Sequence, residues 1–130
     1  MSIKKGRLSG KLQSSNATIT INIPVYKFKE DGLCFVYTPA LEIISYDKTE
    51  KLSESSFETM LEEFFNYTVN KKTLKKALTD LGWSVHPRSK TKKAVCPDIL
   101  TMAENNSDFK DILNTKEYQK IDYPMPIPAY

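Results

Sequence analysis

The hydrophobic periodicity of the chain changes once, near Thr49, and this change most limits the folds available to it. Before it, apolar and polar residues alternate over residues 17–25, as in a half-buried β-strand. After it, apolar residues recur at i, i+3, i+4, i+7, i+8 and i+11, which is one stripe of an amphipathic helix. The stripe comprises Phe57, Met60, Leu61, Phe64, Phe65 and Thr68. The sequence therefore predicts a small α+β fold, with this helix covering one face of an antiparallel sheet of three to five strands.

The residues before Thr49 predict a meander. Asp31-Gly32 tolerates positive φ, so residues 26–29 and 33–37 should form a hairpin, and residues 41–46 should add a third strand. The apolar phase moves by one residue after Val25, so we expect a bulge or strand break near Pro24, at an edge of the sheet. The first dozen residues should add an outer strand, paired with residues 17–23 through a turn at 14–16.

The remaining residues predict shorter elements. Asp47 or Thr49 should cap the long helix, and residues 72–81 should form a second helix that stops at Gly82. Short strands are expected at 83–86 and 94–96, and short helices at 98–102, capped by Asp98, and at 107–113. Residues 123–130 alternate proline with apolar residues, which favours an extended, polyproline-like segment strapped across its own domain. We thus expect one domain over residues 1–130, with its core in 17–70 and the second helix and short elements in 71–130.

Composition limits the class of protein. Apolar residues make up 40% and aromatic residues 11% of the 130 residues, as in folded globular proteins. No apolar run approaches the roughly 18 residues needed to cross a bilayer, and the start lacks a signal-peptide stretch, so we expect a cytoplasmic protein without a membrane partner. Cys34 and Cys96 are expected to be reduced thiols. With His86, the single histidine, they lack a fourth zinc ligand, so neither a metal site nor a cofactor is expected.

The net charge of +3 is distributed unevenly. The long helix is acidic, and we expect its carboxylates to form a protein-binding surface consisting of Glu50, Glu54, Glu58 and Glu62. A basic stretch follows it and could hold phosphates electrostatically, without base specificity. This stretch consists of Lys71, Lys72, Lys75, Lys76, Arg88, Lys90, Lys92 and Lys93. A solvated surface that aids solubility is an equally open interpretation of the same lysines.

The order of turn, strand, break, strand and helix resembles the N-terminal module of the HicB family of antitoxins. The matching positions are Asp31-Gly32, Pro39, Leu41, the segment 46–49 and Glu50, with Ser53 and Phe57 at the small and apolar helix positions. The resemblance covers about 45 residues and departs where the family has a glycine before the threonine, near Asp47.

This resemblance implies a partial RNase H-like fold, a curved sheet of three or four strands with a helix on one face. It also implies an antitoxin of a type II toxin–antitoxin pair, which neutralises a small basic mRNA-cleaving toxin by masking its active surface. Members of the family are often dimers, and many bind DNA, so a homodimer and a DNA partner stay open. No helix-turn-helix pattern follows Lys71.

Catalytic residues are not expected. An RNase H-like outline invites a metal-dependent nuclease built from Glu42, Asp47 and either Glu50 or Glu54, but acids that alternate with Ile43 and Ile44 along a strand do not establish a shared cavity. The glycines are scattered and form no phosphate-binding loop. We therefore expect a non-enzymatic binding module, with nucleic-acid binding through the lysines as the alternative.

Overall fold

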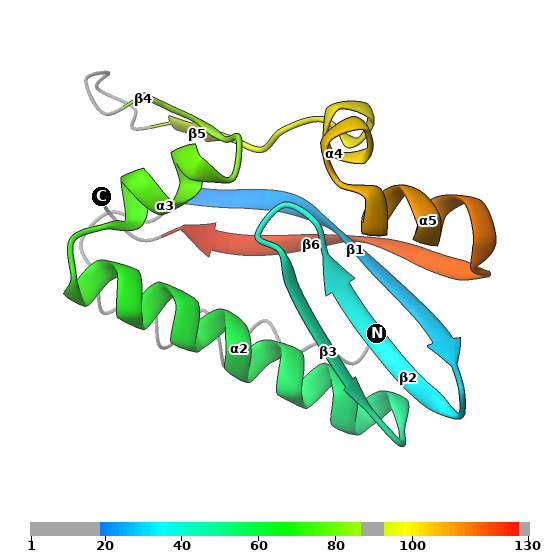
Figure 1. Cartoon of the computed structure of the whole chain (residues 1–130). Coiled ribbons are helices and arrows are strands. Elements are labelled where there is room, and N and C mark those ends of the chain that lie inside the picture. The colour runs from blue at the N-terminus through cyan, green and yellow to red at the C-terminus, as the bar shows by residue number, and fades with distance from the viewer. Residues whose placement is uncertain (1–18, 87–92, 128–130) are drawn as a thin grey trace.

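A four-stranded antiparallel sheet forms the centre of the protein, in a computed structural model that describes residues 19–86 and 93–127 (Figure 1). Its order is β3-β2-β1-β6, and its strands are β1 (Ile19–Glu30), β2 (Leu33–Thr38), β3 (Ile43–Asp47) and β6 (Tyr118–Ile127). A separate two-stranded sheet pairs β4 (Ser84–His86) with β5 (Lys93–Val95). The predicted α+β fold is confirmed. The outer strand expected from the first dozen residues lies outside the described part of the chain.

The hairpin and the long helix form where the sequence predicts them. Asp31 and Gly32 have φ values of 55° and 77°, and the turn closes on the pair Glu30 and Leu33. Helix α2 (Glu50–Asn70) begins at Thr49, whose hydroxyl accepts the amide hydrogen of Leu52 at 3.2 Å. The helix lies across one face of the sheet (Figure 1). The members of its apolar stripe are buried, except for Met60 and Phe64, which are half-buried.

Strand β1 is continuous, so the predicted break near Pro24 is wrong. Its register with β6 runs through Pro24 without a bulge. The apolar phase moves because the second face of β1 is also covered. Ile23 and Val25 face α2, whereas Tyr26 and Phe28 face the opposite side of the sheet.

Pro24 lies in a central strand and not at an edge, but it needs no N–H there. Its carbonyl points toward β2 and accepts the hydroxyl hydrogen of Thr38 at 2.9 Å. An N–H at this position would also point toward β2. The pairing of β1 with β2 ends at Tyr26 and Tyr37, so this N–H would have no paired residue of β2 opposite it. The proline therefore removes no ladder hydrogen bond.

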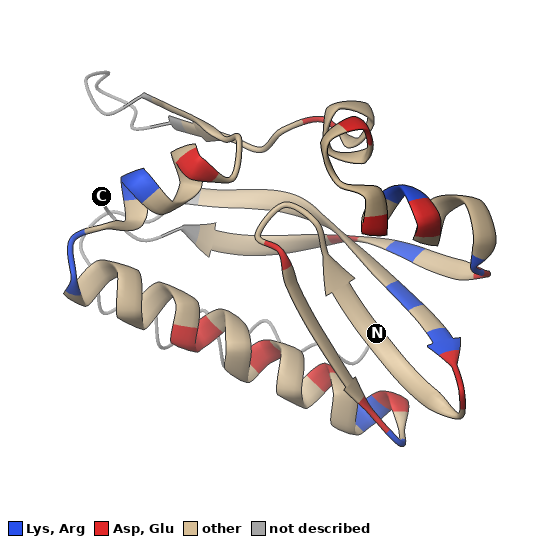
Figure 2. Ribbon diagram, viewed as in Figure 1, with Lys and Arg blue, Asp and Glu red and all other residues tan. Residues whose placement is uncertain are grey.

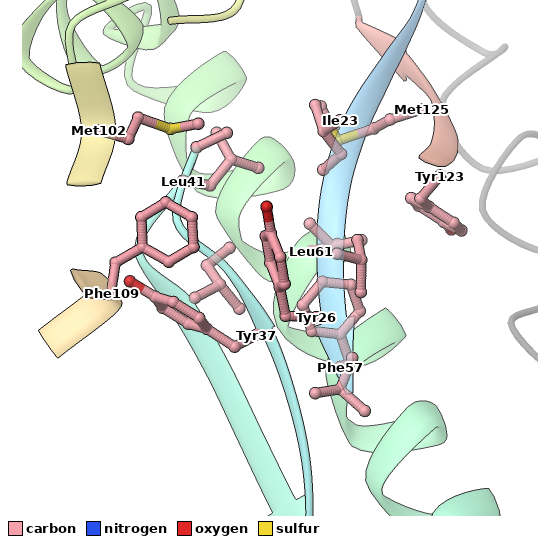
Figure 3. Packing of buried hydrophobic residues seen from close by; sticks show 14 of the residues in the cluster. Ile23, Tyr26, Tyr37, Leu41, Phe57, Leu61, Met102, Phe109, Tyr123 and Met125 are labelled. Carbon is pink, nitrogen blue, oxygen red and sulfur yellow. The ribbon is translucent and has the colours of Figure 1, made fainter. Parts of the chain in front are cut away.

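The opposite face of the sheet is covered by α5 (Ser107–Thr115), which follows α4 (Ile99–Asn105). The Phe109 ring packs edge-on against Tyr26 and Tyr37, with centroids 5.1 and 6.1 Å apart (Figure 3). Asn106 caps α5 and donates a hydrogen bond to the Tyr37 hydroxyl at 3.0 Å. Both helices and the Asp98 cap of α4 were predicted, but not that α5 closes the second face.

Residues 123–127 of the predicted polyproline-like segment form a β-strand instead, as part of β6, and residues 128–130 lie outside the described part of the chain. Strand β6 pairs along β1, as in Ile23 with Tyr123, so the segment's predicted place on its own domain is confirmed. The backbone nitrogen and carbonyl of Pro24 point away from β6, so those of its partner Asp122 point outward, away from β1. Pro124 and Pro126 follow Asp122 at intervals of two residues, and their backbone groups therefore point outward as well. The prolines thus lie where the edge of the sheet needs no N–H, and they leave that edge without donors at these positions.

Helix α3 (Leu74–Asp80) is shorter than predicted. It ends as expected before Gly82, which has φ 94°. Trp83 then packs into the core, where its Nε1–H donates to the Ala40 carbonyl at 2.8 Å. This side chain is therefore unavailable for stacking on a base.

Removing an aromatic ring from either face should destabilise the fold to a similar extent. Phe57→Ala and Phe109→Ala should each lower the free energy of unfolding by about 3–5 kcal/mol, because each leaves a cavity in a buried core. Leu100→Ala, at an exposed residue of α4, should change it by less than about 0.5 kcal/mol. Urea unfolding followed by circular dichroism measures all three. A value near zero for Phe109→Ala would contradict a second covered face.

Candidate functional site

The carboxylates expected to bind a partner form one row along α2, but only part of the row is accessible. The spacing of four residues places Glu50, Glu54, Glu58 and Glu62 on one side of the helix. The Glu50 side chain is 56% exposed and Glu62 is half-buried, whereas Glu54 and Glu58 are buried. The expectation that the whole row faces solvent is therefore wrong. The row borders the apolar stripe, and its middle turns toward the sheet.

Lys27 of β1 is the reason that acids can be buried there. Its side chain rises from the face that also carries Ile23 and Val25. Its ammonium group forms ion pairs with Glu50 Oε1, at 2.7 Å, and with Glu54 Oε2. The side chains of Lys27 and Glu54 are only 10% and 2% exposed. The pair thus joins the centre of the sheet to the first turns of α2.

The ionisation of this cluster is set by burial and by the two carboxylates together. Burial alone would lower the pKa of Lys27, but its hydrogen bonds to Glu50 and Glu54 outweigh that effect, and the pKa is raised. The hydrogen bond from Lys27 holds the pKa of Glu50 below its usual value. Glu54 Oε1 is buried without a hydrogen-bond partner in the part of the chain that the structure describes. Lys27 and Glu50 are therefore charged at neutral pH, and removing Lys27 from the buried side of α2 would be costly.

The solvent-facing side of α2 has a different character. We call residues 52, 56, 60, 63 and 67 the outer flank of α2, because their spacing places them along one side of the helix. Leu52 and Tyr67 on this flank are 50% and 63% exposed, and Met60 is half-buried. Glu63 is exposed between them, and Glu62, which precedes it in the helix, is half-buried. This surface combines exposed apolar side chains with carboxylates.

The predicted basic surface is only partly described. Lys71, Lys72, Lys75 and Lys76 are all exposed near the junction of α2 and α3 (Figure 2). Lys71 and Lys72 lie in the turn before α3 and not on the helix, because α3 begins at Leu74. Lys76 pairs with Asp80 at 2.8 Å. Arg88, Lys90 and Lys92, with the side chain of Lys93, lie outside the described residues.

The carboxylates considered for a nuclease do not meet in one place. Glu42 and Asp47 flank β3 at opposite ends, which an extended strand separates by about 16 Å. Glu50 and Glu54 are engaged with Lys27. Within residues 19–86 and 93–127, no three His, Cys, Asp or Glu side chains come together to hold a metal. Cys34 and Cys96 are both free thiols, and burial raises the pKa of Cys96 to about 11.

A pocket of about 580 Å³ lies beside the ion pair of Lys27 with Glu50, between the hairpin and the start of β6. Lys27 and Glu50 are on its wall, together with Lys116 and Tyr118. Two of its three lysines are matched by acids, since Lys27 binds Glu50 and Lys116 binds Glu30 at 2.9 Å, and the third, Lys29, shares the lining with Glu117. The pocket therefore does not select a ligand of one charge.

A scan against protein-family models, a search of curated proteins and a search of solved structures each returned no match. In the described part of the chain, no helix is long and apolar enough to cross a membrane.

Sequence reasoning missed Lys27, although a signal for it exists. Lys27 continues the odd-numbered series Ile21, Ile23 and Val25 of a strand whose face is covered by a helix. A lysine at such a position requires a buried anion, and the acids of α2 repeat every four residues opposite it. Together these patterns predict an ion pair between strand and helix.

Replacing only one partner of the Lys27–Glu54 ion pair should lower the free energy of unfolding by more than replacing both partners with apolar residues. Lys27→Met leaves Glu54 buried without its cation and should lower the free energy of unfolding by about 3–5 kcal/mol. Lys27→Met combined with Glu54→Leu should cost clearly less than the sum of the two single changes. Urea unfolding of the wild type, the two single variants and the double variant gives this coupling energy. Strictly additive values would show that the pair does not link the sheet to α2.

The same cluster predicts a pH dependence. The pKa of Glu50 is lowered in the folded protein, so its contribution to the free energy of unfolding is complete above the usual pKa of 4.5. This contribution is lost as the pH falls through the lower pKa of the folded state. The pKa of Lys27 is raised in the folded protein, so its contribution to the free energy of unfolding is complete below the usual pKa of 10.5. This contribution is lost as the pH rises through the higher pKa of the folded state. The difference in unfolding free energy between wild type and Lys27→Met should thus be largest between these limits. A difference independent of pH would contradict the assignment.

Proposed function

We propose that this protein is a non-enzymatic binding module of the HicB-like type, which acts in the cytoplasm by covering a partner protein. The observation that carries the proposal is the outer flank of α2, where Leu52 and Tyr67 are exposed beside Glu63. Exposed tyrosine and leucine rimmed by polar groups are typical of protein interfaces. The partner that fits has an apolar contact surface with a basic rim.

The antitoxin role follows from adding the sequence resemblance to this surface. A small basic mRNA-cleaving toxin has the chemistry that such a flank would bind, with Glu63 on the flank and Glu50 as the exposed acid of the original row. The hairpin, the Pro39 turn and the Thr49 cap have the order that the resemblance rests on. The partial RNase H-like fold is part of the same proposal.

The direct test uses the short basic open reading frame expected beside this gene. Expressed alone it should stop growth of a bacterial host, and expression of this protein should restore growth. Leu52→Lys combined with Tyr67→Lys should weaken binding of the toxin by at least about thirtyfold, because exposed apolar anchors dominate interfaces. Isothermal titration calorimetry measures the affinity.

Leu100→Lys is the matched control, since Leu100 is also an exposed apolar residue but lies on α4. It should bind like wild type. The absence of a toxic neighbour would refute the antitoxin role. Equal binding by the flank variant and the control would refute the role of α2.

The alternative function, nucleic-acid binding, is favoured by the exposure of Lys71, Lys72, Lys75 and Lys76 at one junction. If it is correct, affinity for a random oligonucleotide should fall steeply as salt rises, because binding releases counterions. Lys75→Glu with Lys76→Glu should reduce the affinity and the salt slope, whereas Lys51→Glu on α2 should not. Fluorescence anisotropy measures both. Binding that is absent or insensitive to salt removes this alternative.

A further inference from the structure

The two edges of the main sheet differ in the backbone groups that they offer. At the β6 edge, Pro124 and Pro126 have no N–H at their outward positions. At the other edge, no strand lies beyond β3 in the part of the chain that the structure describes (Figure 1). Ile44 and Tyr46 of β3 are 40% and 60% exposed there. The β3 edge is therefore the edge at which an added strand would find partners for its main chain.

The directions of the backbone groups along β3 follow from the hairpin. Its two-residue turn makes the closing residues a hydrogen-bonded pair, so every second residue of β2 from Cys34 onward directs its N–H and C=O groups toward β3. Val36 is one of these residues, and its partner Ser45 points back toward β2. Ile44 and Tyr46, on either side of Ser45, therefore point outward. Their donor and acceptor groups repeat at about 7 Å, which is the two-residue repeat of an extended chain.

A row of aromatic rings crosses the sheet and ends at this edge. Tyr118, Phe28, Phe35 and Tyr46 are direct partners on the four strands, on the face away from α2. The rings of Phe28 and Phe35 stack with centroids 5.0 Å apart, and those of Phe35 and Tyr46 are 5.5 Å apart. A residue opposite Tyr46 on an added strand would continue this row. An aromatic or β-branched side chain is favoured there.

Helix α2 limits what fits on the other face of an added strand. The Ser45 hydroxyl donates to the Ser53 carbonyl of α2 at 2.7 Å, whereas Glu54 pairs with Lys27, two strands further in. The helix therefore lies over β3, and its side beyond Ser53 looks toward the β3 edge. A strand beside β3 would lie partly under α2, because neighbouring strands are about 4.8 Å apart and a helix is about 10 Å wide. The residue opposite Ser45 would face α2 and should be small.

The same helix keeps a second copy of this chain from pairing at the edge. Two β3 strands joined antiparallel about a two-fold axis would place both α2 helices on one face, over strands about 4.8 Å apart. Packed helices need about 8–10 Å between their axes, so the two copies of α2 would collide. An extended segment that carries no helix above it meets no such obstacle.

We propose that the β3 edge binds an extended segment of another protein, which pairs antiparallel with Ile44 and Tyr46 as a further strand of the sheet. Antiparallel pairing lets each of these residues exchange two hydrogen bonds with the segment. The segment has aromatic or β-branched residues opposite Ile44 and Tyr46 and a small residue opposite Ser45. Its main chain supplies affinity, and these alternate side chains supply specificity. The proposal goes beyond the proposed function, which requires only the outer flank of α2.

A capped seven-residue peptide tests the proposal with the full chain. Its three central residues are isoleucine, alanine and tyrosine in that order, so that isoleucine lies opposite Tyr46 and tyrosine opposite Ile44, and a threonine and a lysine at each end keep it soluble. NMR measures amide hydrogen exchange with up to about 5 mM peptide, because short segments bind weakly. Exchange at Ile44 and Tyr46 should slow at least about tenfold on binding. The outward amide of Lys120, at the β6 edge, should be unaffected.

A methylated peptide tests the main-chain hydrogen bonds without changing the protein. Methyl groups on the main-chain nitrogens of its isoleucine and tyrosine keep the side chains but remove two donors. This peptide should bind at least about tenfold more weakly than its parent.

Protein variants test the edge itself. Tyr46→Pro should abolish binding of the parent peptide, because it removes an outward N–H and the exposed ring at an edge position that tolerates proline. Lys120→Pro is the matched control, since it places proline at an outward position of the β6 edge, and it should bind like wild type. Leu52→Lys combined with Tyr67→Lys should also bind like wild type, which separates this proposal from the proposed function. Circular dichroism checks that each variant keeps the fold.

Three outcomes would overturn the proposal: no protection of Ile44 and Tyr46 at about 5 mM peptide, equal binding of the methylated peptide, or wild-type binding by a folded Tyr46→Pro variant. Protection of the two amides without peptide, together with a dimer in sedimentation equilibrium, would also overturn it, because the edge would then belong to a second copy.

Discussion

The rest of the structure depends on the burial of β1 on both faces. Ile23 and Val25 pack under α2, and Tyr26 packs under Phe109 of α5, while β2 and β6 flank the strand on either side. A strand enclosed in this way must be apolar on both sides, and each layer around it is held by contact with it. The C-terminal strand and helix α5 are therefore parts of the same core as the hairpin, although they are far from it in sequence.

Lys27 places a charge within the enclosed part of β1, on the same face as Ile23 and Val25. A buried ammonium group requires a buried anion, and Glu50 and Glu54 of α2 supply the carboxylates that pair with it. The pair adds little net stability compared with an apolar substitute, but it penalises any helix position that leaves either charge unpaired. Lys27 thereby determines how α2 lies on the sheet, and it draws Glu54 away from the surface that the sequence assigned to a partner.

Local features of the sequence predicted most of the elements. Asp31-Gly32 encodes the hairpin, and the Thr49 cap and the stripe at Phe57 and Leu61 encode α2, because turn chemistry and periodicity act over a few residues. The pairing of β1 with residues 118–127 could not be predicted, since register between distant segments depends on packing that no local pattern records. The proline-rich end was misinterpreted for this reason, and so was the phase change near Pro24, which reflects a second covered face. The acids of α2 were assigned to solvent because periodicity alone does not show where the edge of a buried stripe lies.

The proposals assign different surfaces to different partners. All of this requires β1 to be the enclosed central strand. Native-state amide hydrogen exchange measures this most directly: the amides of Ile23, Val25 and Tyr26 should be among the slowest in the protein and exchange only through global unfolding. Exchange of these amides as fast as that of exposed turn residues would contradict the account.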